Sequence, residues 1–135
     1  MINSSAIRKA FCLVLLTGAA AMAHHQFSSE YDKSKPLTLT ATVKSVDWKS
    51  PHVQWTVSAK NQAGAIEDWT LEGAAPDYLT SHGVTKATFA DGSMVTVNAY
   101  RATNNSRTAS VRVITDAKGK AIQVCDPTED GGPAK

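Results

Sequence analysis

The segment Val53–Ala59, which reads VQWTVSA, has the clearest strand pattern of the chain. Apolar side chains occupy every second position of this segment, and polar side chains fill the positions between them. Because successive side chains of a β-strand point to opposite faces, this period predicts a strand with one buried and one exposed face. Residues 61–64 (NQAG) follow as a predicted hairpin turn, and residues 66–71 form the predicted return strand, which carries Trp69.

The preceding residues 37–43 show the same alternation, with threonine at every second position. Val46 and Trp48 are also apolar, but they continue the pattern in the opposite register. A strand that changes its buried face midway indicates a β-bulge, which bends the strand. We expect Ser50-Pro51 to end this first strand.

The period changes after the third predicted strand. Residues 74–82 (AAPDYLTSH) predict a short helix, because Pro76 suits a first helical turn and Gly83 suits a C-terminal cap. Strand patterns return around residues 95–100, 110–115 and 120–124. This order favours a mainly β fold, a small OB-like five-stranded barrel with one short helix between strands 3 and 4. An open β-sandwich is the alternative.

Residues 1–23 have the features of a secretory signal peptide. Arg8 and Lys9 are basic, residues 10–18 are apolar, and Ala21-Met22-Ala23 matches a signal-peptidase site. The apolar run is shorter than the roughly 20 residues that a membrane-spanning helix needs. We therefore expect cleavage after Ala23, a periplasmic or secreted protein, and no membrane attachment after cleavage. Cleavage after Ala21 is the alternative register.

A chain of 135 residues has room for one domain. The formal net charge is +2, and removal of the two basic residues of the signal leaves equal numbers of acidic and basic side chains. This balance argues against a nucleic-acid-binding protein, which would carry a strongly basic surface. We expect an N-terminal arm at residues 24–36, the barrel domain at residues 37–125 and a disordered tail at residues 126–135.

Several short motifs follow one another in a characteristic order. They are His24-His25-Gln26-Phe27, Glu30-Tyr31-Asp32, the strand at residues 39–43, Trp48, Pro51-His52, Trp69 before Glu72-Gly73, and residues 92–97 before Tyr100-Arg101-Ala102. In this combination the chain resembles a family of small secreted bacterial proteins, the domain of unknown function 6152. The resemblance covers roughly residues 23–115. It implies a signal peptide, a small β-fold and an exported location, and it implies no established activity. The tail with Cys125 departs from the pattern.

The sharpest functional hypothesis concerns the new N-terminus. If the chain is cut after Ala23, the α-amine and the imidazole of His24 can chelate one metal ion together. A ring nitrogen from a second histidine would complete a T-shaped set of three nitrogens, a histidine brace, which favours Cu(II). His52 is the most plausible second ligand, His82 is the next, and His25 could serve as an extra ligand. Copper is the one cofactor that the sequence suggests.

The other cleavage register also favours copper, by a different geometry. A cut after Ala21 would leave Met22-Ala23-His24 at the N-terminus. A histidine in third position binds Cu(II) through the amine, two backbone amides and the imidazole. Cys125 is the one cysteine after residue 23, so it is a free thiol, a metal ligand or an intermolecular disulfide partner.

The alternative function is a periplasmic interaction module with incidental histidines. Such a module would bind a peptide or a saccharide of a partner on its barrel face, and Trp48, Tyr100 and Arg101 are the candidates for that face. Trp55 shares its face with valines, so we expect it in the core. The carboxylates of Glu67, Asp68 and Glu72 are interpreted as a solvated acidic edge.

An enzyme is the weakest of the three hypotheses. The sequence contains no nucleophile elbow, no Gly-rich phosphate loop and no HExxH motif. A copper brace could activate oxygen, but the chain is small for that chemistry and shows no clear substrate surface. We therefore predict a non-enzymatic binding protein whose partner is a metal ion or a periplasmic protein.

Overall fold

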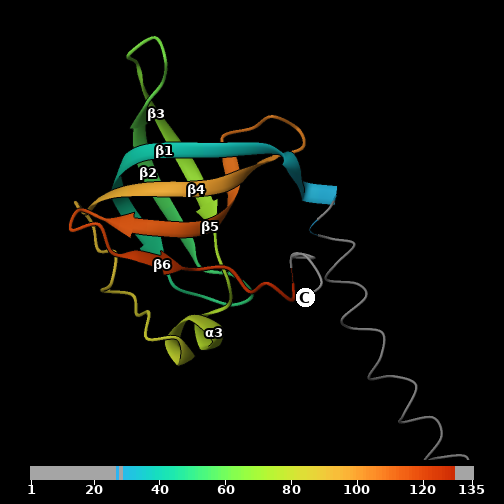
Figure 1. Ribbon diagram of the computed structural model, residues 1–135, viewed down its shortest axis with the longest axis vertical. Coiled ribbons are helices and arrows are strands. Elements are labelled where there is room, and N and C mark those ends of the chain that lie inside the picture. The colour runs from blue at the N-terminus through green and yellow to red at the C-terminus, as the bar shows by residue number, and fades with distance from the viewer. Residues whose placement is uncertain (1–26, 28, 130–135) are drawn as a thin grey trace, which may run out of the picture.

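The computed structural model describes residue 27 and residues 29–129, which form a mainly β structure (Figure 1). The sequence-based order of strands and helix is confirmed. The elements are β1 (Tyr31–Asp47), β2 (Gln54–Lys60), β3 (Ile66–Glu72), the short helix α3 (Pro76–Ser81), β4 (Met94–Ala102), β5 (Thr108–Asp116) and β6 (Ala121–Gln123). Within these described residues, no helix is long and apolar enough to cross a membrane.

All six strands belong to one sheet, in the order β3-β2-β1-β4-β5-β6. Neighbours in this order are antiparallel. In addition β3 pairs with β5 in parallel, through Thr70–Glu72 and Thr108–Ser110. This extra pairing closes β1, β2, β3, β5 and β4 into a ring of five strands, and β6 extends the sheet beyond β5.

The core follows directly from the alternation along β2. Val53, Trp55, Val57 and Ala59 are buried, while the polar residues between them are half-buried. Trp55 packs edge to face against Phe89, with ring centroids 6.5 Å apart and an interplanar angle of 80°. A pair in this geometry adds about 0.5–1.5 kcal/mol to the gain from burial alone. The expectation that Trp55 is a core residue is therefore confirmed.

The bulge predicted in the first strand is present in β1. Opposite β2, Val43 pairs with Val57 and Ser45 pairs with Thr56, so Lys44 is the extra residue. The β1 strand lies between β2 and β4, and its bend lets it pair with both around the ring. Beyond the bulge the buried face changes, and Val46 and Trp48 pack partly buried against the core.

Two predicted boundaries differ from the structure. The strand β1 begins at Tyr31, inside the segment expected to be an arm, because Tyr31 pairs with Ala102 of β4. Residues 126–129, expected to belong to a disordered tail, form a turn in which the Asp126 carboxylate accepts hydrogen bonds from the backbone and hydroxyl of Thr128. The signal peptide at residues 1–23 and the rest of the tail at residues 130–135 lie outside the described residues.

The helix α3 forms where the proline and glycine signals predict it. Pro76 is in its first turn, and Gly83 adopts a φ of +77° directly after the cap residue His82. A residue with a Cβ rarely adopts this left-handed conformation, so glycine is the natural residue there. Leu79 anchors the helix by burying its side chain in the core.

Candidate functional site

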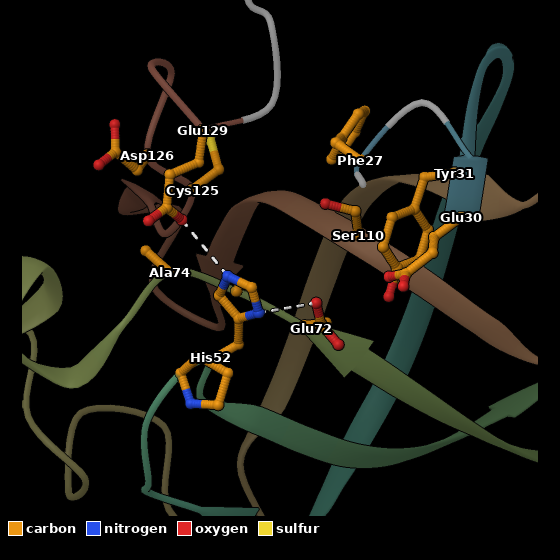
Figure 2. Close-up of a pocket in the computed structure, with 12 residues that line it drawn as sticks. Phe27, Glu30, Tyr31, His52, Glu72, Ala74, Ser110, Cys125, Asp126 and Glu129 are labelled. Carbon is orange, nitrogen blue, oxygen red and sulfur yellow. Dashed lines mark hydrogen bonds and ion pairs between the residues drawn. The ribbon is translucent and has the colours of Figure 1, made fainter. Parts of the chain in front are cut away.

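A cavity of about 410 Å³ opens between the start of β1, the end of β3 and the C-terminal segment (Figure 2). This volume lies in the range of roughly 300–1,000 Å³ that small-molecule sites occupy. The residues of its wall that matter for chemistry are Phe27, Glu30, Tyr31, His52, Glu72, Ser110, Cys125, Asp126 and Glu129. They come from parts of the chain that are far apart in the sequence.

The turn after β3 joins these parts at one point. The Gly73 N–H donates to the Val53 carbonyl at 2.9 Å, and the Ala74 N–H donates to the Val124 carbonyl at 2.8 Å. A Cβ at position 73 would lie 2.6 Å from Cζ3 of Trp55 and 2.9 Å from the Val124 oxygen. Only glycine fits this close approach, which brings His52, Glu72 and Cys125 to one wall.

His52 lies between two carboxylates in this cavity (Figure 2). Its Nδ1 is 3.0 Å from Oε1 of Glu72, and its Nε2 is 3.3 Å from Oε2 of Glu129. The hydrogen bond to Glu72, helped by the charges of both carboxylates, raises the pKa of His52 although burial lowers it. The hydrogen bond from His52 in turn lowers the pKa of Glu72, so an imidazolium-carboxylate pair is favoured.

Tyr31 lies on the same cavity wall as Glu72. Burial, followed by the charges of Glu72 and Glu30, raises the pKa of the Tyr31 hydroxyl well above its usual value. The phenol therefore stays neutral beside the Glu72 carboxylate. Glu72, His52 and Glu129 thus form one continuous chain of polar contacts along the cavity, and Tyr31 lies on the same wall.

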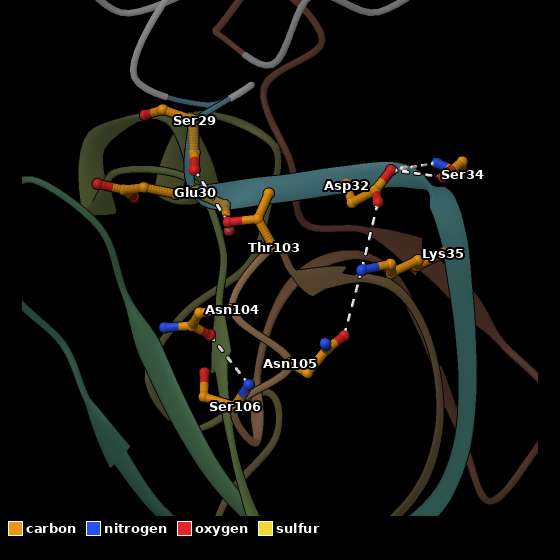
Figure 3. A network of polar contacts seen from close by, with 9 residues as sticks. All are labelled: Ser29, Glu30, Asp32, Ser34, Lys35, Thr103, Asn104, Asn105 and Ser106. Carbon is orange, nitrogen blue, oxygen red and sulfur yellow. Dashed lines mark hydrogen bonds and ion pairs between the residues drawn. The ribbon is translucent and has the colours of Figure 1, made fainter.

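A separate polar network fixes the start of β1 against the loop after β4 (Figure 3). Thr103 donates its N–H to the Glu30 carbonyl at 2.9 Å and its hydroxyl to the Ser29 carbonyl at 3.0 Å. Lys35 reaches Oδ1 of Asn105 at 3.2 Å and Oδ2 of Asp32 at 3.5 Å. These contacts hold the segment that supplies Phe27, Glu30 and Tyr31 to the cavity wall.

Two uncharged polar groups complete the wall. Cys125 is buried, and burial is the main reason that the pKa of its thiol is raised, so the thiol is neutral at neutral pH. Ser110 on β5 is 8% exposed and also faces the cavity. Cys125 forms no disulfide within the part of the chain that the structure describes.

Comparison with known proteins identifies the family. Residues 12–111 match a family of unknown function (DUF6152). The chain belongs to this family. The matched segment of this DUF6152 protein contains His52, Glu72 and Ser110, and it ends before Cys125 and Glu129. No curated protein and no solved structure matches the chain.

The histidines predicted as metal ligands have different places in the structure. His52 lines the cavity. The ring of His82 instead stacks on the ring of Tyr78, with centroids 4.1 Å apart, and its Nδ1 donates to the Tyr78 carbonyl at 2.8 Å. His82 is not among the residues that line the cavity. His24 and His25 lie outside the described residues. Within residue 27 and residues 29–129, no group of three or more His, Cys, Asp or Glu side chains is arranged to hold a metal ion.

The three residues proposed for a ligand face do not lie together. Trp48 follows the end of β1, whereas Tyr100 pairs with Pro36 near the start of that strand. Arg101 is next to Tyr100 on β4, so the two side chains point to opposite faces. The guanidinium of Arg101 lies 5.3 Å from the centroid of the Trp69 ring.

The carboxylate partners of His52 are not evident from the sequence. Glu72 was expected on a solvated edge, but its side chain is 20% exposed and faces the cavity. Its position directly before Gly73, at the end of the predicted strand, is a usable signal. Glu129 had no such signal, because its contact depends on the turn at Asp126.

Proposed function

We propose that this protein is exported and binds Cu(II) at the mouth of the cavity, without acting as an enzyme. The ligands are the α-amine and imidazole of His24, created by cleavage after Ala23, and the imidazole of His52. One observation supports this most strongly, which is that Phe27 lines the same cavity as His52. Residue 24 is three positions before Phe27, so covalent geometry limits their Cα separation to about 11 Å.

The surroundings of His52 suit a metal ligand. Histidines that bind metals usually donate their other ring nitrogen to a carboxylate, which fixes the ring and its tautomer. Glu72 holds Nδ1 of His52 in this way at 3.0 Å. The nitrogen available to a metal is then Nε2, whose present neighbour is Glu129. His82 is the weaker candidate, because its Nδ1 is bound to its own helix and it does not line the cavity.

Protons compete with Cu(II) for the proposed nitrogen ligands. The pKa of His52 is raised, mainly by Glu72, so Cu(II) has to displace a proton that is held more firmly than usual. The α-amine must also lose a proton, from a group that titrates near pH 8. Copper affinity should therefore rise steeply with pH through neutrality.

We further propose that the ring of five strands is a small OB-like barrel. The support is the strand order β1-β2-β3-β5-β4, the bulge in β1 and the helix between β3 and β4. A module that binds a peptide or saccharide has less support, because Trp48, Tyr100 and Arg101 are separated.

The copper proposal is tested by titrating Cu(II) into the protein secreted from its full sequence, with the N-terminus verified by mass spectrometry. We expect one-to-one binding that weakens strongly when the α-amine of His24 is acetylated, since the chelate of amine and imidazole is then lost. His52→Gln should weaken binding at least about 10-fold, because even a change to an outer-shell partner of a metal ligand typically costs about 10- to 100-fold. His82→Gln is the matched control and should leave the affinity unchanged. Equal binding by all four proteins would refute the proposal.

A further inference from the structure

The charge of the cavity favours a cation. Glu30, Glu72 and Glu129 place carboxylates on its wall, and His52 is the one basic side chain among the residues that line it. Even with His52 protonated between Glu72 and Glu129, these groups carry a net negative charge. Asp126 also lines the cavity, but its carboxylate is held by Thr128.

Ser110 gives an independent indication of a ligand. Its residue is 8% exposed, and Figure 2 shows its hydroxyl directed into the space between Phe27 and His52. Among the described residues the Ser110 hydroxyl has no hydrogen-bond partner, and it is open to the cavity rather than enclosed, while its backbone pairs with Tyr100 of β4. A hydroxyl on a cavity wall can both donate and accept a hydrogen bond, so an unpartnered one marks a position where a ligand can bond.

The aromatic rings of Phe27 and Tyr31 form another part of the cavity wall. The rings of Phe27 and Tyr31 lie 5.5 Å apart between centroids, at an angle of 41°. The ammonium of Lys33 lies 5.7 Å from the centroid of Phe27, so this ring is already within cation–π range of an ammonium group. Aromatic rings next to carboxylates suit a ligand that has a charged head and an alkyl chain.

We propose that the cavity binds a small organic cation with a primary ammonium group. The ammonium donates hydrogen bonds to the carboxylates and to the Ser110 hydroxyl, and the alkyl part packs against Phe27 and Tyr31. This inference goes beyond copper binding, because Ser110, Glu30 and Phe27 are not among the proposed copper ligands. The metal-free protein should therefore bind the cation by itself.

The test is an NMR titration of ¹⁵N-labelled protein, expressed from its full sequence and treated with EDTA, with n-butylammonium. We expect saturable shifts of the amides of Tyr31, Gly73 and Ser110. The neutral 1-butanol and the anionic butyrate, at equal ionic strength, should produce no such shifts. The proposal is overturned if 1-butanol gives the same shifts or if the shifts lie elsewhere. Choline has no N–H donor, so binding of choline with equal affinity would contradict recognition of a primary ammonium group.

Matched variants distinguish binding in the cavity from a general attraction of the cation to negative charges on the protein. Ser110→Ala and Glu30→Gln should each weaken n-butylammonium binding by about 3- to 10-fold. Asp91→Asn removes a carboxylate from an exposed turn before β4 and should leave binding unchanged. Glu30 is exposed, so its substitution keeps the fold even if Ser110→Ala does not. Weakening of the same size by Asp91→Asn would contradict the proposal. Because the EDTA-treated sample holds no copper, failure to bind n-butylammonium can be told apart from failure to bind copper.

Discussion

Replacing Gly73 by alanine should strain the turn that builds the cavity. The added Cβ would lie 2.6 Å from Cζ3 of Trp55, which is about 1 Å inside an ordinary carbon–carbon contact. It would also lie 2.9 Å from the carbonyl oxygen of Val124. Trp55 cannot move aside freely, because its ring is buried and packs on Phe89. The turn itself must therefore shift.

The expected cost of Gly73→Ala is about 2–3 kcal/mol, the upper part of the range for an overpacked core. Equilibrium unfolding in urea measures it, and the midpoint should fall by roughly 1–2 M for a typical dependence on denaturant. Because Glu72 precedes the turn, the same change should shift the NMR titration of His52 toward its ordinary pKa.

The variant Trp55→Phe provides the control, since phenylalanine lacks the ring atoms that the new Cβ would meet. In that background Gly73→Ala should cost less, with a coupling of about 1 kcal/mol in the double-mutant cycle. A cost below about 0.5 kcal/mol, or the same cost in both backgrounds, would refute the packing argument.

Three further predictions concern the cavity. Glu72→Gln should lower the pKa of His52 in a ¹H NMR titration, because the largest cause of its rise is removed, while Glu67→Gln on the same strand should leave it unchanged. The raised pKa of His52 contributes stability that is complete below its ordinary value of 6.5 and is lost as pH rises through the folded value, so His52→Gln should destabilise more at about pH 5.5 than at about pH 8.5. A larger loss at the higher pH would contradict that sign. The neutral, buried thiol of Cys125 should react slowly with iodoacetamide in the native protein and rapidly in urea, and mass spectrometry showing rapid native labelling would be the opposite result.

The strands could be predicted because their signals are local. The alternation in Val53–Ala59 and the change of register between Val43 and Val46 are visible within a few residues, and both correspond to the structure. The start of β1 was missed, because residues 32–35 are polar and Tyr31 joins the sheet through a pairing with the distant Ala102. Local patterns cannot report such a pairing.

The candidate site was predictable only in part, for the same reason. His52 could be selected as a chemically useful residue after the first strand. Its partners come from the end of β3 and from the C-terminal turn, so only the folded chain shows that Glu72 and Glu129 flank it. The burial of Tyr31, which raises the pKa of its hydroxyl, likewise depends on packing across the ring of strands. The same packing places Ser110 on the cavity wall.

The most direct test of the copper site is an electron paramagnetic resonance spectrum of the one-to-one Cu(II) complex, recorded for the native protein and for His52→Gln. The sample begins at His24, as mass spectrometry must establish. The proposed site predicts a tetragonal spectrum with nitrogen hyperfine structure that changes when the His52 nitrogen is lost. Identical spectra from the two proteins would show that His52 is not a ligand and would contradict the proposed function.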